Sequence, residues 1–222
     1  IAGLNFANRQ NAGGEYLGGS RAQEEDLCRL APTLYFSLRK LRYPITERDA
    51  HVTEAILART YGTFALDATT ATTGPIQCHF ISAAMPNVRS PRCRITVGSD
   101  EWLQTVRVRL RAVLHAAYAA GSGTLVLGAF GCGSFGNPPE LVAALMAEAL
   151  ASREFRGAFR CVVFAISVNK AEEQASLGFF ESHCRRLAEP NFGWGVQDSQ
   201  AIQQLALKYI GATRDPRPDA AG

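Results

Sequence analysis

A pair of adjacent carboxylates near the start of the chain has the composition of a catalytic site. Glu24 and Glu25 follow a glycine-rich stretch, residues 11–19, at the point where a helix is expected. Carboxyl groups supply and remove protons in general acid–base catalysis. Neighbouring helical side chains point about 100° apart, so one acid would reach a ligand while the other orients the ligand or holds the loop. The alternative is a pair of solvated acids that the helix dipole favours at this position.

A second glycine-rich loop, residues 131–136, follows an apolar strand and precedes a helix. Its three glycines let backbone N–H groups approach an anion, and the helix N-terminus adds a favourable dipole. We therefore predict a cradle for a diphosphate, with a plain strand-to-helix turn as the alternative. The loop also satisfies GxGxxG, but it lies late in the chain and the next strand ends at Ile166 and Ser167 without an acid. A nicotinamide-dependent oxidoreductase is therefore not favoured.

The elements that must position these loops alternate between strands and helices. Apolar runs predict buried strands at residues 4–7, 77–84, 124–130 and 159–166. Helical spacing predicts helices from Ser20 onward with a break at Pro32, and at 54–59, 102–120, 137–150, 175–187 and 200–209. Capping-box patterns at Ser20 and Asn137 predict two of the helix starts. This order predicts an α/β fold with a mixed or mostly parallel sheet.

The same pattern predicts one domain over residues 1–211, a loop at 69–74 and a disordered tail at 212–222. Ligands bind at the carboxyl ends of strands in such sheets. Both glycine-rich loops follow a predicted strand, so we expect them to serve one ligand. Because the chain begins with Ile1 rather than Met, we also expect native residues upstream.

Composition excludes several classes of protein. The chain has 222 residues with 47% hydrophobic and 19% charged residues, and it contains no 18-residue apolar run, which excludes a membrane span. A net charge of +3 on scattered bases gives no support for nucleic-acid binding. Six cysteines without CxxC or zinc-type spacing predict no metal site but free, buried thiols in a reducing, intracellular compartment, cytoplasmic or nuclear. The helix that follows Cys132 could lower the pKa of this thiol. A nucleophilic role is not favoured, because no histidine is close to it in the sequence.

Taken together, the motifs resemble the poly(ADP-ribose) glycohydrolase family of the bacterial type. The resemblance extends over about residues 4–183. It is carried by residues 5–8, by Gly13 and Gly14 followed by Gln23-Glu24-Glu25, and by residues 82–87 and 128–137. One position departs from the family pattern, because Glu15 occupies the third place of its glycine triplet.

This resemblance implies a macrodomain-like three-layer sandwich, with the sheet between helices. It also implies hydrolysis of the C1″ glycosidic bond in poly- or mono-ADP-ribosylated proteins, which releases ADP-ribose without a cofactor. Glu25 is the implied acid and base, and Glu24 the implied support of the ribose. The implied substrate-binding residues are Asn8, Gly13, Gly14, Glu15, Gln23, Gly131, Cys132, Gly133, Ser134 and Phe135.

Two alternatives to this function stay open at the level of sequence. An extra carboxylate at Glu15 is suited to hold a guanidinium, which favours a hydrolase specific for mono-ADP-ribosyl-arginine. Glu15 is equally well explained as a solvated loop acid. The same residues also suit a module that binds ADP-ribose without cleaving it.

Overall fold

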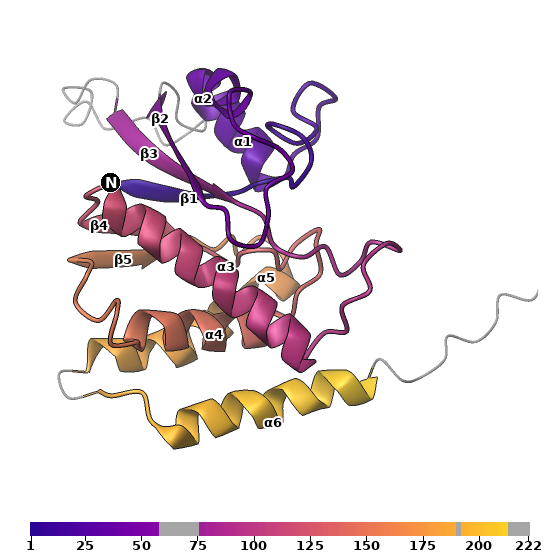
Figure 1. Cartoon of the computed structure of the whole chain (residues 1–222), viewed down its shortest axis with the longest axis vertical. Coiled ribbons are helices and arrows are strands. Elements are labelled where there is room, and N and C mark those ends of the chain that lie inside the picture. Colours follow the sequence, from indigo (N-terminus) through magenta and orange to yellow (C-terminus); the bar gives the residue numbers. More distant parts are fainter. Residues whose placement is uncertain (58–75, 190–191, 213–222) are drawn as a thin grey trace, which may run out of the picture. The chain divides into compact units, whose positions relative to one another are not determined.

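Five strands form one sheet in the computed structural model of the chain, which describes residues 1–57, 76–189 and 192–212 (Figure 1). The strands are β1 (Ala2–Phe6), β2 (His51–Leu57), β3 (Ile76–Ala83), β4 (Thr124–Leu127) and β5 (Cys161–Phe164). Their order is β2-β3-β1-β4-β5, with β2 antiparallel to β3 and every other pair parallel. The predicted fold class, α/β with a mixed and mostly parallel sheet, is confirmed.

Six α-helices and one short 3₁₀ helix accompany the sheet within the described residues. They are α1 (Gln23–Leu30), α2 (Pro32–Leu38), α3 (Asp100–Ala119), α4 (Pro139–Ala151), α5 (Ala171–Arg185), η1 (Arg186–Ala188) and α6 (Val196–Ala212). The break predicted at Pro32 is confirmed, since this residue begins α2. Among these helices, none has the length and apolar character needed to cross a membrane.

The chain divides into two compact units. The first comprises Ile1–Met85, Arg111–Gly128 and Gly157–Phe164, and so contains the whole sheet with α1 and α2. The second comprises Pro86–Leu110, Ala129–Arg156 and the chain from Ala165 onward, with α4, α5 and α6. The single domain over residues 1–211 therefore stays a prediction. The loop predicted at 69–74 and the tail from 213 lie outside the described residues.

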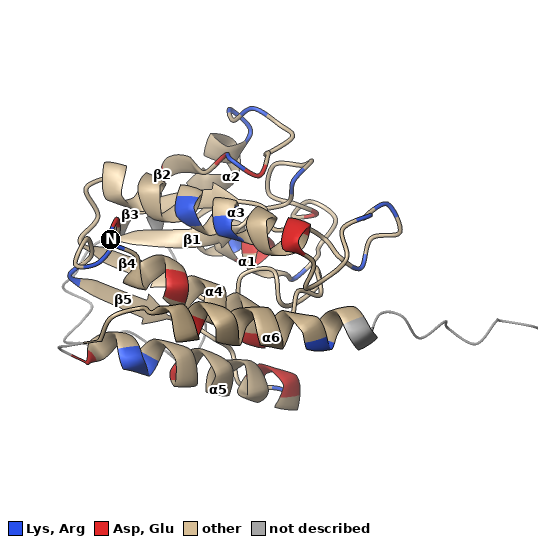
Figure 2. Ribbon diagram, turned by 60° about the horizontal axis from the view of Figure 1, so that its bottom comes forward, with Lys and Arg blue, Asp and Glu red and all other residues tan. Residues whose placement is uncertain are grey.

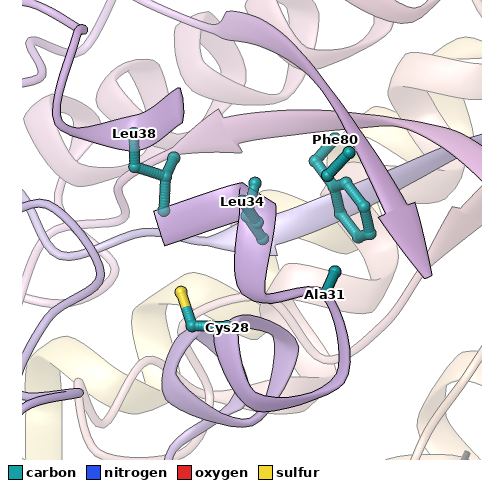
Figure 3. Packing of buried hydrophobic residues seen from close by; sticks show 6 residues of the cluster. Cys28, Ala31, Leu34, Leu38 and Phe80 are labelled. Atoms are coloured by element: carbon teal, nitrogen blue, oxygen red, sulfur yellow. The ribbon is translucent and has the colours of Figure 1, made fainter. Parts of the chain in front are cut away.

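A compact apolar cluster anchors α1 and α2 in the first unit (Figure 3). Cys28, Leu34 and Leu38 are fully buried and pack with Phe80 of β3. Burying such a side chain contributes about 1.5–3 kcal/mol. The packing holds α1 in place, and with it the two glutamates of its first turn.

Several local predictions are wrong. Of the helix predicted at 54–59, residues 54–57 belong to β2, because pairing with β3 overrides weak helical spacing. Residues 58 and 59 lie outside the described residues. β5 is not buried, because it is an edge strand on which Cys161 and Val163 are exposed. All six cysteines are free as predicted, but only Cys28 is fully buried.

Both predicted capping boxes are also wrong. Helix α1 begins at Gln23 instead of near Ser20, with Ala22 at its N-cap and no capping side chain. Helix α4 has Pro138 at its N-cap instead of Asn137. The patterns assigned the side chains of Gln23 and Asn137 to capping, but these side chains form hydrogen bonds with other segments instead.

Candidate active site

Gln23 fastens the start of α1 to the central strand of the sheet. Its Nε2 donates to the Leu4 carbonyl (2.7 Å), and its Oε1 accepts from the Phe6 N–H (2.8 Å). The side-chain amide thus pairs with a carbonyl and an N–H that lie two residues apart on β1. A neighbouring strand would pair with the same two groups. Gln23 is therefore a positioning residue, and its contact with substrate stays a prediction.

Glu24 is buried (2% exposed) and held on both carboxylate oxygens. Oε1 accepts from Asn5 Nδ2 (3.2 Å), which also donates to Ser82 Oγ (3.0 Å), and Oε2 accepts from the Asn8 N–H (2.7 Å). Burial raises the pKa of Glu24 to about 7, and the charge of Glu25 acts in the same direction. Its oxygens are already engaged by the protein, so Glu24 is arranged to hold the loop rather than to exchange protons.

Glu25 is buried as well (6% exposed), but its two oxygens differ. Oε1 accepts from the Glu15 N–H (3.0 Å), whereas Oε2 is buried and has no hydrogen-bond partner in the described part of the chain. Burying a carboxylate oxygen without a hydrogen-bond donor lowers the stability of the folded protein, and such oxygens are typical of functional sites. Glu25 therefore offers one fixed oxygen and one available oxygen.

The glycines before the helix explain how the backbone comes so close to these acids. Gly14 has a φ of +57°, and a Cβ added there would lie 2.3 Å from Glu25 Oε1. Gly13 has a φ of +69°, and its added Cβ would lie 2.7 Å from the ring of Tyr35. Both positions thus require glycine for conformation and for space.

Glu15 does not disturb this arrangement. Its φ is not positive, its side chain is exposed, and its N–H still reaches Glu25. The carboxylate bends back toward Gly18, where an added Cβ would lie 3.5 Å from Glu15 Oε2. The Glu15 side chain therefore does not crowd the approach of the backbone to Glu25.

Asn8 shapes the loop that precedes the glycines. Its Oδ1 accepts from the N–H groups of Gln10 (2.8 Å) and Asn11 (3.1 Å). Its Nδ2 has no acceptor within residues 1–57, 76–189 and 192–212 and is available as a donor. Contact of Asn8 with a substrate stays a prediction.

Tyr43 is a polar neighbour that sequence analysis did not identify. Its hydroxyl is buried without a partner among the described residues, and the ring packs against Ala7, Ile45 and Ala84. Burial raises the pKa of Tyr43, and the charge of Glu24 raises it further. No specific signal in the sequence marked this residue, because Tyr43 is a single aromatic residue in a segment without clear periodicity.

The loop at residues 131–136 lies in the second unit and has a different character. The N–H groups of Cys132 and Gly136 bind within the loop region, to the carbonyls of Ala129 (3.0 Å) and Gly133 (3.0 Å). The remaining four N–H groups have no acceptor in the described chain; they belong to Gly131, Gly133, Ser134 and Phe135. Unpaired N–H groups on a partly exposed loop are the donors that an anion requires.

Asn137 fixes the shape of this loop through side-chain hydrogen bonds, whereas the sequence predicted it to cap the following helix. Its Nδ2 donates to the carbonyls of Pro86 and Gly131 (both 2.9 Å), and its Oδ1 accepts from Trp102 Nε1 (3.1 Å). The residue is buried (1% exposed). No local signal could reveal this role, because Pro86 and Trp102 are distant in the sequence.

The thiol of Cys132 is largely buried and is not arranged as a nucleophile. Its thiol lies 3.6 Å from the Phe130 carbonyl, and burial raises its pKa to about 12. The predicted lowering of this pKa by the helix N-terminus is therefore wrong. Desolvation of the thiolate outweighs the dipole.

The structure thus brings Asn8, Gly13, Gly14, Glu15, Gln23, Glu24 and Glu25 together in the first unit. It brings Gly131, Cys132, Gly133, Ser134 and Phe135 together in the second. No cluster of three metal-ligating side chains occurs among the residues that the structure describes.

A mixed sheet with a carboxylate pair behind one glycine-rich loop and free N–H groups on another defines a macrodomain-type hydrolase of the kind the sequence suggested. Comparison with known proteins agrees. Residues 1–57, which contain both glutamates, match the microbial-type PARG catalytic domain. No curated protein sequence gives a significant match.

Solved structures identify the family. A poly(ADP-ribose) glycohydrolase from Deinococcus radiodurans in complex with ADP-ribose is 34% identical, with a TM-score of 0.68, and the match covers 85% of this chain and 76% of that one. The apo form of the enzyme gives 31% identity, a TM-score of 0.64, and coverage of 85% and 75%. The enzyme from Thermomonospora curvata is 32% identical, with a TM-score of 0.60 and coverage of 82% and 67%. The chain belongs to the bacterial-type poly(ADP-ribose) glycohydrolase family.

Proposed function

We propose that this chain hydrolyses the C1″ glycosidic bond of ADP-ribosylated proteins and releases ADP-ribose, with Glu25 as the acid and base. The observation that carries the proposal is the asymmetry of the Glu25 carboxylate. One oxygen is fixed by the Glu15 N–H, while the other is buried and has no donor in the described part of the chain. Such a carboxylate is fixed in place and free to exchange a proton.

The reaction proceeds in two proton transfers. Protonated Glu25 gives its proton to the leaving oxygen as the C1″–O bond breaks and positive charge develops on the ribose. The resulting carboxylate then takes a proton from the water that attacks C1″. This restores protonated Glu25 and yields ADP-ribose with a hydroxyl at C1″. General acid–base catalysis of this kind supplies about 10²–10⁴-fold in rate.

Other residues bind the substrate in this proposal. Glu24, fixed by Asn5 and Asn8, keeps the loop closed around Glu25. Asn8 Nδ2 donates to a ribose hydroxyl, and the free N–H groups of residues 131–136 bind the diphosphate.

The test is the Glu25→Gln variant. We expect release of ADP-ribose from mono- and poly-ADP-ribosylated protein to fall by about 10²–10⁴-fold, while calorimetry still detects ADP-ribose binding. Asp26→Asn is the matched control, because it removes a neighbouring carboxylate from the same helical turn and should retain most activity. Turnover of Glu25→Gln within a few-fold of the parent would contradict the assignment. A parent chain that binds ADP-ribose and cleaves no linkage would be a binding module.

Linkage preference is tested separately at Glu15. If its exposed carboxylate holds a guanidinium, Glu15→Gly slows release from arginine-linked ADP-ribose and leaves release from the polymer unchanged. Equal effects on both substrates identify Glu15 as a loop acid.

A further inference from the structure

The segment that follows β3 is tied directly to the glycine-rich loop of the second unit. The Val88 N–H donates to the Phe135 carbonyl (2.9 Å), and Asn137 Nδ2 bridges the carbonyls of Pro86 and Gly131 (both 2.9 Å). These bonds fix residues 86–88 against both ends of the loop. Any side chain that follows Val88 is therefore carried to the loop by the backbone.

Arg89 is that side chain, and Gly136 is the surface on which it lies. A Cβ added to Gly136 would lie 2.7 Å from both Cγ and Nε of Arg89 and 3.0 Å from Cδ. The aliphatic part of the arginine thus occupies the space that glycine leaves. Gly136 also has a φ of +73°, so both its conformation and its neighbour require the absence of a side chain.

The charge of Arg89 is available. Arg89 is exposed, and within the described residues it forms no ion pair and no hydrogen bond to a side chain or carbonyl. An arginine whose stem is packed while its guanidinium is unpaired has lost conformational freedom without gaining a partner, which favours binding of an external anion.

We propose that Arg89 binds the substrate diphosphate together with the free N–H groups of Gly131, Gly133, Ser134 and Phe135. The inference rests on the proposed function for the identity of the substrate. A guanidinium forms charge-assisted and bidentate hydrogen bonds to phosphate oxygens, which backbone N–H groups alone do not supply. Arg89 therefore contributes the positive charge at a loop that otherwise offers only dipoles.

Two neighbouring arginines provide matched controls. Arg92 and Arg94 lie on the same basic segment between β3 and α3 (Figure 2), and both are exposed. Neither one is among the nearest neighbours of Gly133 or Gly136 in the described chain. Arg94 lines a separate cavity of about 500 Å³, together with Val97 and Ile210. Arg92 is the better control. Its replacement by glutamine changes the net charge as much as that of Arg89, and Arg92 is neither a nearest neighbour of Gly136 nor among the described residues that line the cavity.

The experiment compares Arg89→Gln with Arg92→Gln by calorimetry. Glutamine keeps the carbon stem over Gly136 and removes the charged guanidinium. We expect the Kd for ADP-ribose to rise about 10-fold for Arg89→Gln, which corresponds to about 1.4 kcal/mol, and less than about 2-fold for Arg92→Gln. The difference should shrink as salt increases, and adenosine, which lacks the diphosphate, should bind both variants equally.

Thermal unfolding and turnover separate this proposal from the proposed function. Both variants should unfold at the parent temperature, and kcat at saturating substrate should stay unchanged while KM rises for Arg89→Gln. Equal loss of ADP-ribose affinity in the two variants, or no loss in either, would overturn the role of Arg89. If the parent binds ADP-ribose without hydrolysing it, the hydrolase assignment fails while the affinity comparison still tests Arg89.

Discussion

The two glycine-rich loops of this protein use their backbone N–H groups in opposite ways. In the loop before α1, the N–H groups of Asn8 and Glu15 are consumed by the protein's own carboxylates. In the loop before α4, four N–H groups have no acceptor within the described residues, Gly133 and Ser134 being exposed among them. The first loop therefore fixes anionic side chains, whereas the second is prepared to bind an anion from outside.

This difference shows that a glycine-rich sequence specifies close approach of the backbone but not what approaches it. Glycine permits a left-handed conformation and leaves space in both loops. In the first loop the space is filled by Glu25 beside Gly14, and in the second by Arg89 beside Gly136. One loop packs against negative charge and the other against positive charge.

The largest loss of activity is expected when Gly14 of the first loop is replaced. Gly14→Ala places a methyl group where Glu25 Oε1 now lies, and it adds left-handed strain of about 1–2 kcal/mol. We expect hydrolysis to fall by about 10²-fold or more, as for other losses of a positioned catalytic group. Gly19→Ala is the control, because Gly19 has a φ of +84° but no described residue within 4 Å of an added Cβ. Similar activity in the two variants would show that contact with Glu25 is unimportant.

The buried acid of the first loop should make stability depend on pH. Burial raises the pKa of Glu24 to about 7 from an ordinary value of 4.5. Between these values the folded protein retains a proton that the unfolded chain releases, so stability falls as pH rises through this window. The loss amounts to about 3 kcal/mol.

Urea unfolding between about pH 4 and pH 8 measures this effect as the difference between the parent and Glu24→Gln. The amide does not titrate, so the variant should lack this part of the pH dependence. Parallel stability curves for the two proteins would show that Glu24 has an ordinary pKa.

The second loop should depend on Asn137 for its shape. Asn137→Ala leaves Trp102 Nε1 and the Pro86 carbonyl without their partner, at a cost of about 2–3 kcal/mol. The Gly131 carbonyl loses the side-chain donor and keeps the backbone N–H of residue 137. We expect thermal unfolding about 5–10 °C lower and weaker ADP-ribose binding. Asn87→Ala, at an exposed asparagine beside the same segment, should unfold at the parent temperature. If the Asn137→Ala protein is folded and binds ADP-ribose with unchanged affinity, binding does not depend on the loop shape that Asn137 maintains.

The smallest effect is expected at Gly133. Within the part of the chain that the structure describes, an added Cβ meets nothing within 4 Å, and the φ lies outside the left-handed region. Gly133→Ala should therefore change stability by less than about 0.5 kcal/mol. ADP-ribose affinity should still fall a few-fold, because the methyl group crowds the approach of an anion to the N–H groups. Gly123→Ala, equally open in space, should leave affinity unchanged.

Much of the architecture was predictable from the sequence because it rests on local and periodic signals. The apolar run around Ile81 and the helical spacing from Trp102 onward both predicted elements close to those observed. Edge strands and caps were less predictable. Val163 is exposed because β5 lies at the sheet edge, which an apolar run cannot indicate.

For the site, the sequence by itself determined which residue types are present and at what spacing: two acids at the start of a helix, and glycines where the backbone must turn. Only the tertiary structure decided their roles. Asn5 and Asn8 engage Glu24, while one oxygen of Glu25 is left without a donor among the described residues. Asn137 binds Pro86 and Trp102 instead of capping a helix. The reason is physical, because hydrogen bonds between residues far apart in sequence form only when packing brings buried donors and acceptors together.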